Sequence, residues 1–323
     1  MKIHDTFLIT HQSLKQWLFA ALLITCLGDA SAQQDAGFSQ YFFNQLYINP
    51  AYTGSRQTIA GTIVHRSQWV NMPGAPTTQS ATIHSPINNT HSGLGLMVYN
   101  DKAGPLGNTG VQASYSYYVP VGKYKLAFGL SGGAHNIRVN YDDIRVEDRT
   151  DGVFNGNASS WIPDASAGIY LYRNRFYAGV SALHLFEPSF DLGSTDNAEF
   201  KRHYYFTSGI VFRVNDNVDF RPSVLAKFIN SAPVVLDGNA SFIFYQRLFL
   251  GAGFRHNQRV NIDGSDNVAV AIAEFNITPS LRLGYSYDWY LNHSGNYTSG
   301  THEIMLGFDI NPHKTKMTSP RYF

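Results

Sequence analysis

The segment VQASYSYYV, residues 111–119, alternates between two kinds of side chain. One set of positions is apolar or aromatic: Val111, Ala113, Tyr115, Tyr117 and Val119. The positions between them are mainly small or polar: Gln112, Ser114, Ser116 and Tyr118. Because successive side chains of a β-strand point to opposite faces, this period of two predicts a strand with one apolar face. A strand of roughly ten such residues can cross a hydrocarbon layer at a tilt.

The same alternation recurs along the chain, for example in VDFRPSVLAKFI (residues 218–229) and LRLGYSYDWYL (residues 281–291). An even number of strands is typical of barrels that cross a bacterial outer membrane. We predict fourteen strands, at 58–69, 77–86, 92–101, 109–120, 123–137, 162–173, 176–186, 201–214, 217–229, 233–245, 248–257, 266–276, 280–291 and 301–310.

The connections between these strands also follow a rhythm. Those after even-numbered strands are short: 121–123, 173–175, 214–217, 245–247 and 276–280. Most of those after odd-numbered strands are longer: 70–76, 138–161, 187–200, 258–265 and 292–300. The loop near Asn230 breaks the rule once. Outer-membrane barrels have short periplasmic turns and long external loops, so an even strand count predicts that both termini lie in the periplasm.

The alternative is a secreted β-sandwich or propeller, whose turns recur at similar intervals. Strands in such folds are shorter, at around five or six residues. Strand length and loop rhythm therefore favour an all-β fold, a transmembrane antiparallel up-and-down β-barrel of about 14 strands over residues 58–310. It would lie in the outer membrane of a Gram-negative cell, in contact with outer-membrane lipid.

The composition agrees with export and with a membrane barrel. Residues 1–32 combine Lys2 and Lys15 with the apolar run WLFAALLIT and end in Ala-Ser-Ala, as a cleavable signal peptide does. Charged residues make up 15% of the chain, against about 25% in typical soluble domains. Without residues 1–32 the chain holds no cysteine and has 22 basic against 21 acidic residues, so neither a disulfide-stapled module nor nucleic-acid binding is supported.

The sequence contains only incomplete versions of catalytic and metal-binding motifs. GLSGG (129–133) falls inside a predicted strand, and HEIML (302–306) lacks the second histidine of a zinc-protease motif. DGSDN (263–267) lacks the closing glutamate of a calcium loop, and the histidines show no ligand spacing. We therefore expect no enzyme activity, no cofactor and no metal site.

Charged residues of both signs occupy the polar face of the predicted strands. Facing a wet lumen, mixed charge costs little, whereas facing lipid it costs several kcal/mol, on the order of 2–4 for each basic residue. These residues could form a network that fixes strand register or an ion-selectivity ring. The predicted lumen set is Asp219, Arg221, Lys227, Asp237, Arg282, Asp288 and Glu303.

The N-terminal stretch QYFFNQLYINPAYTGS, residues 40–55, is rich in aromatic residues and carries no charge. In a barrel of this width, residues 33–57 could fold into the lumen as a plug or form a periplasmic docking arm for another protein. The residues predicted to make these plug or partner contacts are Tyr41, Asn44, Gln45, Asn49 and Tyr52.

The C-terminal tail, residues 311–323, follows the last predicted strand. Its final residues Arg321, Tyr322 and Phe323 could bind a periplasmic partner or assist insertion of the barrel into the membrane.

Several blocks of the chain resemble the PorP/SprF family of type IX secretion proteins. They are SQYFFNQLYINPAYTGS (39–55), HRSQWVNMPGAPTTQSATIHSPI (65–87), GLGLMVYNDKAGPLG (93–107), HEIMLGFDI (302–310) and the final SPRYF (319–323). The most specific parts are NPAY-G in the first block and Gln68-Trp69 with Gly74-Ala75-Pro76 in the second. The resemblance marks Pro50, Gly54, Arg66 and Trp69 as further candidates for plug or partner contacts.

The resemblance implies a barrel that works with the type IX secretion machinery and supports export or surface attachment of adhesin-like cargo. It further implies contact with peptidoglycan-linked periplasmic proteins of the secretion or gliding motor. The residues alone leave open a second function, a diffusion or uptake channel for small or hydrophobic solutes.

Overall fold

The computed structural model describes residues 36–140, 158–190, 198–230, 232–257 and 266–310. The predicted signal peptide and C-terminal tail, with Arg321, Tyr322 and Phe323, lie outside the described residues. Within them, no helix is long and apolar enough to span a membrane.

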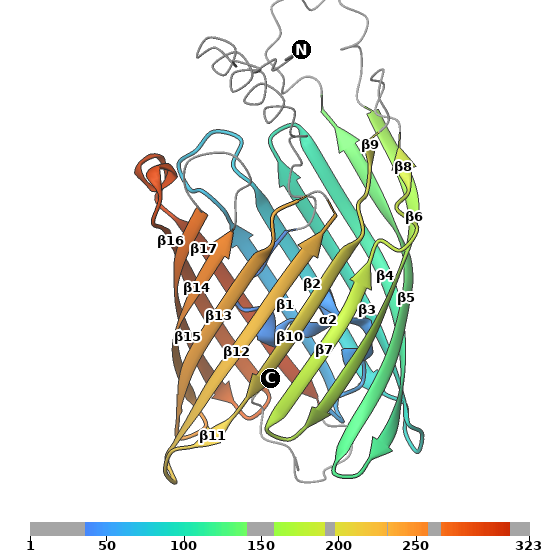
Figure 1. Ribbon diagram of the computed structural model, residues 1–323, viewed down its shortest axis with the longest axis vertical. Helices are drawn as coiled ribbons and strands as arrows, with labels where there is room; N and C mark the ends of the chain where they lie inside the picture. Colours follow the sequence, from blue (N-terminus) through green and yellow to red (C-terminus); the bar gives the residue numbers. More distant parts are fainter. Residues whose placement is uncertain (1–35, 141–157, 191–197, 231, 258–265, 311–323) are drawn as a thin grey trace, which may run out of the picture.

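The described residues form a closed antiparallel barrel of fourteen strands, in which each strand pairs with its neighbour in sequence and β1 pairs with β17 (Figure 1). The strand β10–β11 is interrupted at Val211, and both of its parts pair with β12. The predicted fold and strand count are therefore confirmed. The strands are β1 (Ile59–Ser67), β2 (Thr77–Pro86), β3 (Ser92–Ala103), β4 (Leu106–Val121), β5 (Tyr124–Val139), β6 (Ala158–Arg173), β7 (Phe176–Leu183), β10 (His203–Ile210), β11 (Phe212–Arg213), β12 (Val218–Ile229), β13 (Val235–Phe244), β14 (Leu248–Asn257), β15 (Asp266–Thr278), β16 (Leu281–Tyr290) and β17 (Thr301–Ile310).

The alternation of side chains sets the two faces of the wall. Along β4, Tyr115 is 48% exposed on the outer surface, whereas its neighbour Ser116 is 3% exposed and points inward. Outward positions elsewhere carry large apolar residues such as Leu130 and Phe254. The barrel is thus apolar outside and polar inside, the reverse of a soluble barrel.

The two rims of the barrel differ in their connections. At the short-turn rim, β4–β5, β6–β7 and β15–β16 are joined by two residues each, at 122–123, 174–175 and 279–280. The long-loop rim carries the connections 68–76, 184–202 and 291–300, including the small hairpin of β8 (Ser189–Phe190) and β9 (Ala198–Glu199) and the 3-10 turn η5 (His293–Tyr297). The connection at 104–105 is also tight and lies on the long-loop rim, so the predicted rhythm is broken twice rather than once.

Inside the barrel lies a compact segment, residues 38–53, which we call the plug. It contains the 3-10 turn η1 (Tyr41–Phe43), the single α-turn α2 (Gln45–Ile48) and the 3-10 turn η2 (Pro50–Tyr52). Every plug residue is buried, and Figure 1 shows α2 inside the lumen, enclosed by the strands. The described residues of this segment thus lie in the lumen as a plug, and a docking role for the segment stays a prediction.

The plug runs through the lumen from one rim of the barrel to the other. The described chain begins at Ala36 beside the long-loop rim, since Ser39 bonds to Glu303 near the start of β17. It then descends to Arg56, which pairs with Asp309 at the short-turn rim. The last strand also ends at the short-turn rim. The two ends of the described chain therefore lie at opposite rims. The termini themselves lie outside the described residues, so their shared location in the periplasm stays a prediction.

Candidate functional site

The NPAY sequence of the plug builds a short, self-capped turn. Asn49 precedes η2, and its side-chain oxygen accepts a hydrogen bond of 2.9 Å from the Ala51 N–H. Pro50 occupies the first position of the turn, where no N–H is required. The Asn49 amide also donates to the carbonyls of Ile169 and Val180, at 3.1 and 3.3 Å. One side chain thus caps the start of a turn and ties the plug to β6 and β7.

Glycines on the inner wall let the plug backbone approach that wall closely. A Cβ on Gly129 would lie 2.2 Å from the Ala51 nitrogen, and one on Gly168 would lie 2.1 Å from the Asn49 side-chain oxygen. Gly179 of β7 faces the amide nitrogen of the same asparagine. We call Gly129, Gly168 and Gly179 the glycine cradle. The cradle leaves room for the NPA turn, and a larger side chain at any of its three positions would clash with that turn.

Gly54, the last position of the NPAY-G signature, closes the plug at its lower end. It has a positive φ of 71°, and a Cβ there would lie 2.8 Å from the Gly93 Cα. Both conditions require glycine.

Aromatic residues of the plug stack on basic residues of the wall. The Arg221 guanidinium lies 4.1 Å from the Phe42 ring centre and 4.5 Å from that of Phe43. Arg282 also lies 4.5 Å from the Phe43 ring centre. Such cation–π contacts stabilise a buried cation beside an aromatic ring. Two of the predicted lumen charges therefore contact the plug directly.

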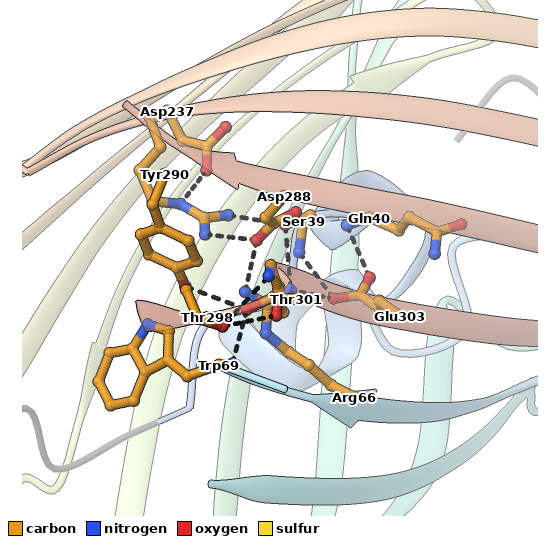
Figure 2. Close-up of polar contacts among 12 residues, drawn as sticks. Ser39, Gln40, Arg66, Trp69, Asp237, Asp288, Tyr290, Thr298, Thr301 and Glu303 are labelled. Carbon is orange, nitrogen blue, oxygen red and sulfur yellow. Dashed lines mark hydrogen bonds and ion pairs between the residues drawn. The ribbon is translucent and has the colours of Figure 1, made fainter. Parts of the chain in front are cut away.

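The upper end of the plug is held by a buried network of charges (Figure 2). Arg66 of β1 pairs with Asp288 at 2.6 Å and with Glu303 at 2.8 Å. Arg255 of β14 pairs with Asp237 at 2.7 Å and with Asp288 at 3.3 Å. The network joins β1, β13, β14, β16 and β17. We call it the charged anchor, comprising Arg66, Asp237, Arg255, Asp288 and Glu303 together with Ser39 and Gln40 of the plug.

The charged anchor is completed by the plug backbone. Its three carboxylates exceed its two guanidinium groups by one negative charge. The backbone N–H groups of Ser39 and Gln40 each donate to Glu303 at 2.9 Å, and the Ser39 hydroxyl donates to Asp288 at 2.7 Å. A buried carboxylate requires such donors, since leaving it unpaired is strongly unfavourable. The wall charges therefore favour an occupied lumen.

A smaller ion pair holds the chain where it leaves the plug at the short-turn rim. Arg56 lies 3.2 Å from Asp309 of β17, and the Thr58 hydroxyl donates to the carbonyl of Ile310 at 2.6 Å. Burial alone would lower the pKa of Arg56, but the Asp309 carboxylate more than compensates, and the pKa is raised. The plug is thus fixed at both of its ends.

Above the plug, a cavity of about 280 Å³ opens toward the long-loop rim. Its lining combines Phe38 of the plug with Trp69 and Met72 of the β1–β2 connection, and with Lys227 of β12. Trp69 is 37% exposed and packs near Tyr290, with ring centres 6.3 Å apart (Figure 2). The cavity offers an apolar and aromatic surface to a molecule that arrives at this rim.

The structure places the sequence-predicted residues as follows. The N-terminal set lies in the lumen, with Tyr41, Asn44, Gln45, Asn49, Pro50 and Tyr52 buried and Gly54 half-buried. The predicted lumen set is buried throughout: Asp219, Arg221, Lys227, Asp237, Arg282, Asp288 and Glu303.

The predicted lumen charges are not gathered in one place. Asp237, Asp288 and Glu303 meet in the charged anchor, Arg221 and Arg282 flank the plug, and Lys227 lies 5.7 Å from the Tyr205 ring centre. Asp219 lies apart at the short-turn rim, 3.8 Å from Arg175 and 4.0 Å from Arg213.

Sequence reasoning missed several residues that hold the plug. Ser39 lies inside the first family block without a signal of its own, and neither Arg255 nor the glycine cradle is among the predicted site residues. Arg255 occupies an inward-facing position in the alternating segment LFLGAGFRHN of β14, so the alternation alone could have placed it in the lumen. Nothing local marks Ser39, because its partner Glu303 is 264 residues away.

Comparison with known proteins agrees with this architecture. The family model for type IX secretion system membrane protein PorP/SprF matches residues 30–308. No curated protein matches the chain. Among solved structures, the CymD monoaromatic hydrocarbon channel is similar with a TM-score of 0.50 and 12% identity, over 88% of this chain and 95% of that one. The crystal structure of the outer membrane protein Omp33 of Acinetobacter baumannii has a TM-score of 0.47 and 12% identity, over 79% of this chain and 100% of that one. At such low identity the likeness concerns the fold alone.

Proposed function

Because the chain belongs to the PorP/SprF family of type IX secretion system membrane proteins, we propose that it is a non-enzymatic outer-membrane barrel that supports export and surface attachment of adhesin-like cargo. Its partners would be type IX secretion components, peptidoglycan-linked periplasmic proteins of the motor, and the cargo itself. The proposal rests on the family together with one observation, the anchored plug.

The plug makes the barrel better suited to holding a partner than to passing solutes. Its residues bond to opposite parts of the wall: Asn44 to Ser80 of β2, Ile48 to Ser181 of β7, and Ser39 to Asp288 of β16. A segment tied on several sides of the lumen is a rigid filling rather than a hinged gate. The exposed parts left for a partner are the two rims.

We propose that the short-turn rim faces the periplasm and the long-loop rim faces outside, as in other outer-membrane barrels. Cargo would then meet the connection that carries Trp69 and Met72, while motor components would meet the short turns and the C-terminal tail with Arg321, Tyr322 and Phe323. In this orientation the plug enters the lumen from the outer side.

Labelling of intact cells tests the orientation. Single cysteines at Asn71 in the β1–β2 connection and at Asp216 in a short turn should behave oppositely toward a membrane-impermeant maleimide. We expect Asn71→Cys to react on intact cells and Asp216→Cys only after the outer membrane is opened. The reverse pattern would contradict the orientation, and the unchanged chain, whose only cysteine lies at position 26, supplies the background.

Gene deletion with complementation tests the function. Without the barrel, the surface adhesin should appear in the medium or remain inside the cell, and the wild-type gene should restore display. A deletion strain with undiminished adhesin on its surface and normal gliding would contradict the proposal.

The cavity above the plug favours one alternative, a channel for small hydrophobic solutes. Its volume of about 280 Å³ and the lining side chains Phe38, Leu225 and Val268 would fit such a molecule. Reconstitution into planar bilayers separates the two functions, because a plugged scaffold should be electrically silent whereas an open channel should conduct. Steady conductance of the wild-type barrel would favour the channel.

A further inference from the structure

A second buried cluster lies on the inner wall, away from the charged anchor. His135 of β5 and Asp164 of β6 point inward, and His184 directly follows β7. Their exposed fractions are 0%, 2% and 2%. In the sequence these residues are widely spaced, so no ligand motif could be recognised, but neighbouring strands bring them together.

The three side chains converge on one point. The Asp164 Oδ2 lies 3.1 Å from the His135 Nε2 and 2.8 Å from the His184 Nδ1. The three candidate ligand atoms all lie within 4.8 Å of one another. Two imidazole nitrogens with one carboxylate form the ligand set of many zinc sites that keep a fourth position open.

The surroundings resemble those that position metal ligands. The Nδ1 of His135 lies 2.6 Å from the Tyr99 hydroxyl, which orients the ring and directs its Nε2 toward Asp164. Metal-binding histidines are commonly held in this way through their other nitrogen. Phe200 stacks on His184 with ring centres 4.6 Å apart and packs with Ile137 and Ile162, so an apolar cover shields the cluster.

One independent feature points to a missing ligand. The second carboxylate oxygen of Asp164, Oδ1, is buried and has no hydrogen-bond partner. The ion-pair contacts of Asp164 described above are with histidines, which carry charge only when protonated. A buried carboxylate oxygen without a donor is costly, and a divalent cation would satisfy it.

We propose that His135, Asp164 and His184 bind a divalent transition metal ion of the zinc type. Bound there, the ion would join β5 and β6 to the start of the connection at 184–202. His184 has a positive φ of 56°, an unusual backbone conformation for a residue other than glycine. The site would thus fasten the start of this connection, and with it Phe200, to the inner wall.

Metal titration of the full barrel tests the proposal. The protein is purified in detergent without a polyhistidine tag, stripped with a chelator, and titrated with Zn²⁺ by calorimetry and with Co²⁺ by visible absorption. We expect one equivalent per chain and a Co²⁺ spectrum typical of nitrogen and oxygen ligands in a four-coordinate site. The double variant His135→Ala/His184→Ala should lose this binding. His65→Ala is the matched control, because His65 is exposed on the outer surface, and it should bind as the wild type does.

Heat-modifiable gel mobility verifies that each variant is folded. If the double variant does not fold, Asp164→Asn replaces it, since it keeps the shape and removes the charged ligand, and its affinity should fall at least about tenfold. The proposal is overturned if the folded wild type binds no stoichiometric Zn²⁺ or Co²⁺, or if the folded variant binds them as the wild type does.

Discussion

Two regions of the plug, its first residues and its NPA turn, are held by different physical means. At the long-loop rim, the wall residues of the charged anchor are joined by ion pairs and hold Ser39 and Gln40 through charge-assisted hydrogen bonds. Deeper in the lumen, the glycine cradle holds the NPA turn through close backbone contact and two amide hydrogen bonds. One contact depends on charge and the other on shape.

This difference indicates separate roles. Buried charges are costly unless every partner is present, so the charged anchor specifies which segment can occupy the lumen. Close packing tolerates no added atoms, so the glycine cradle specifies how deep the segment sits. Four sets of substitutions test whether charge and shape act separately in this way.

The largest effect is expected for Arg66→Ala in the charged anchor. Asp288 and Glu303 would lose their shared cation while remaining buried, which should lower the free energy of unfolding by about 3–5 kcal/mol. Denaturant unfolding of the barrel in lipid vesicles measures this change. A loss below about 1 kcal/mol would mean that solvent reaches the network and that charge does not hold the plug.

Gly129→Ala should come next, because its new Cβ would meet the Ala51 nitrogen at 2.2 Å. Backbone cannot yield as a flexible side chain does, so we expect overpacking of about 1–3 kcal/mol and displacement of the NPA turn. Gly132→Ala is the matched control on the same strand, since nothing lies within 4 Å of its Cβ position. Thermal unfolding compares the stabilities of the two variants, and equal stabilities would contradict a tight fit between Gly129 and the NPA turn.

A smaller and more diagnostic effect is expected from coupling between Asn49 and Gly168. Asn49→Ala removes a turn cap and should cost about 0.5–2 kcal/mol. It also removes the oxygen that the Cβ of Gly168→Ala would strike at 2.1 Å. The second substitution should therefore be better tolerated in the Asn49→Ala background, with a coupling of about 0.5–3 kcal/mol from a double-mutant cycle. Strict additivity would show that these two groups do not meet.

Arg202→Ala should have the smallest effect. Its pair with Glu187 spans 3.4 Å, but the two side chains are 35% and 37% exposed in the connection at 184–202. Exposed ion pairs contribute little to stability, so unfolding should be indistinguishable from wild type. A clear loss of stability would show that this exposed ion pair contributes to folding as the buried pairs of the charged anchor do.

The barrel could be predicted from the sequence because each strand carries its own signal. The alternation in residues 111–119 is complete within nine residues, and it places Ser114 and Ser116 inward without knowledge of any neighbour. The NPA turn also has a local signal, since asparagine followed by proline is typical of a capped turn.

The direction of the plug and the histidine cluster could not be predicted in this way. The plug runs from the long-loop rim downward because Ser39 meets β16 and β17, which follow it by about 250 residues. His135, Asp164 and His184 come together only through the register of β5, β6 and β7. Such contacts are fixed by closure of the barrel rather than by any short stretch of sequence.

The place where Ser39 sits has a consequence for biogenesis. Its partners Arg66 and Glu303 lie on β1 and β17, the two strands whose pairing closes the barrel. The pairing of β1 with β17 therefore forms next to Ser39, a residue that precedes the first strand. During insertion into the membrane, the barrel would therefore have to close around the plug.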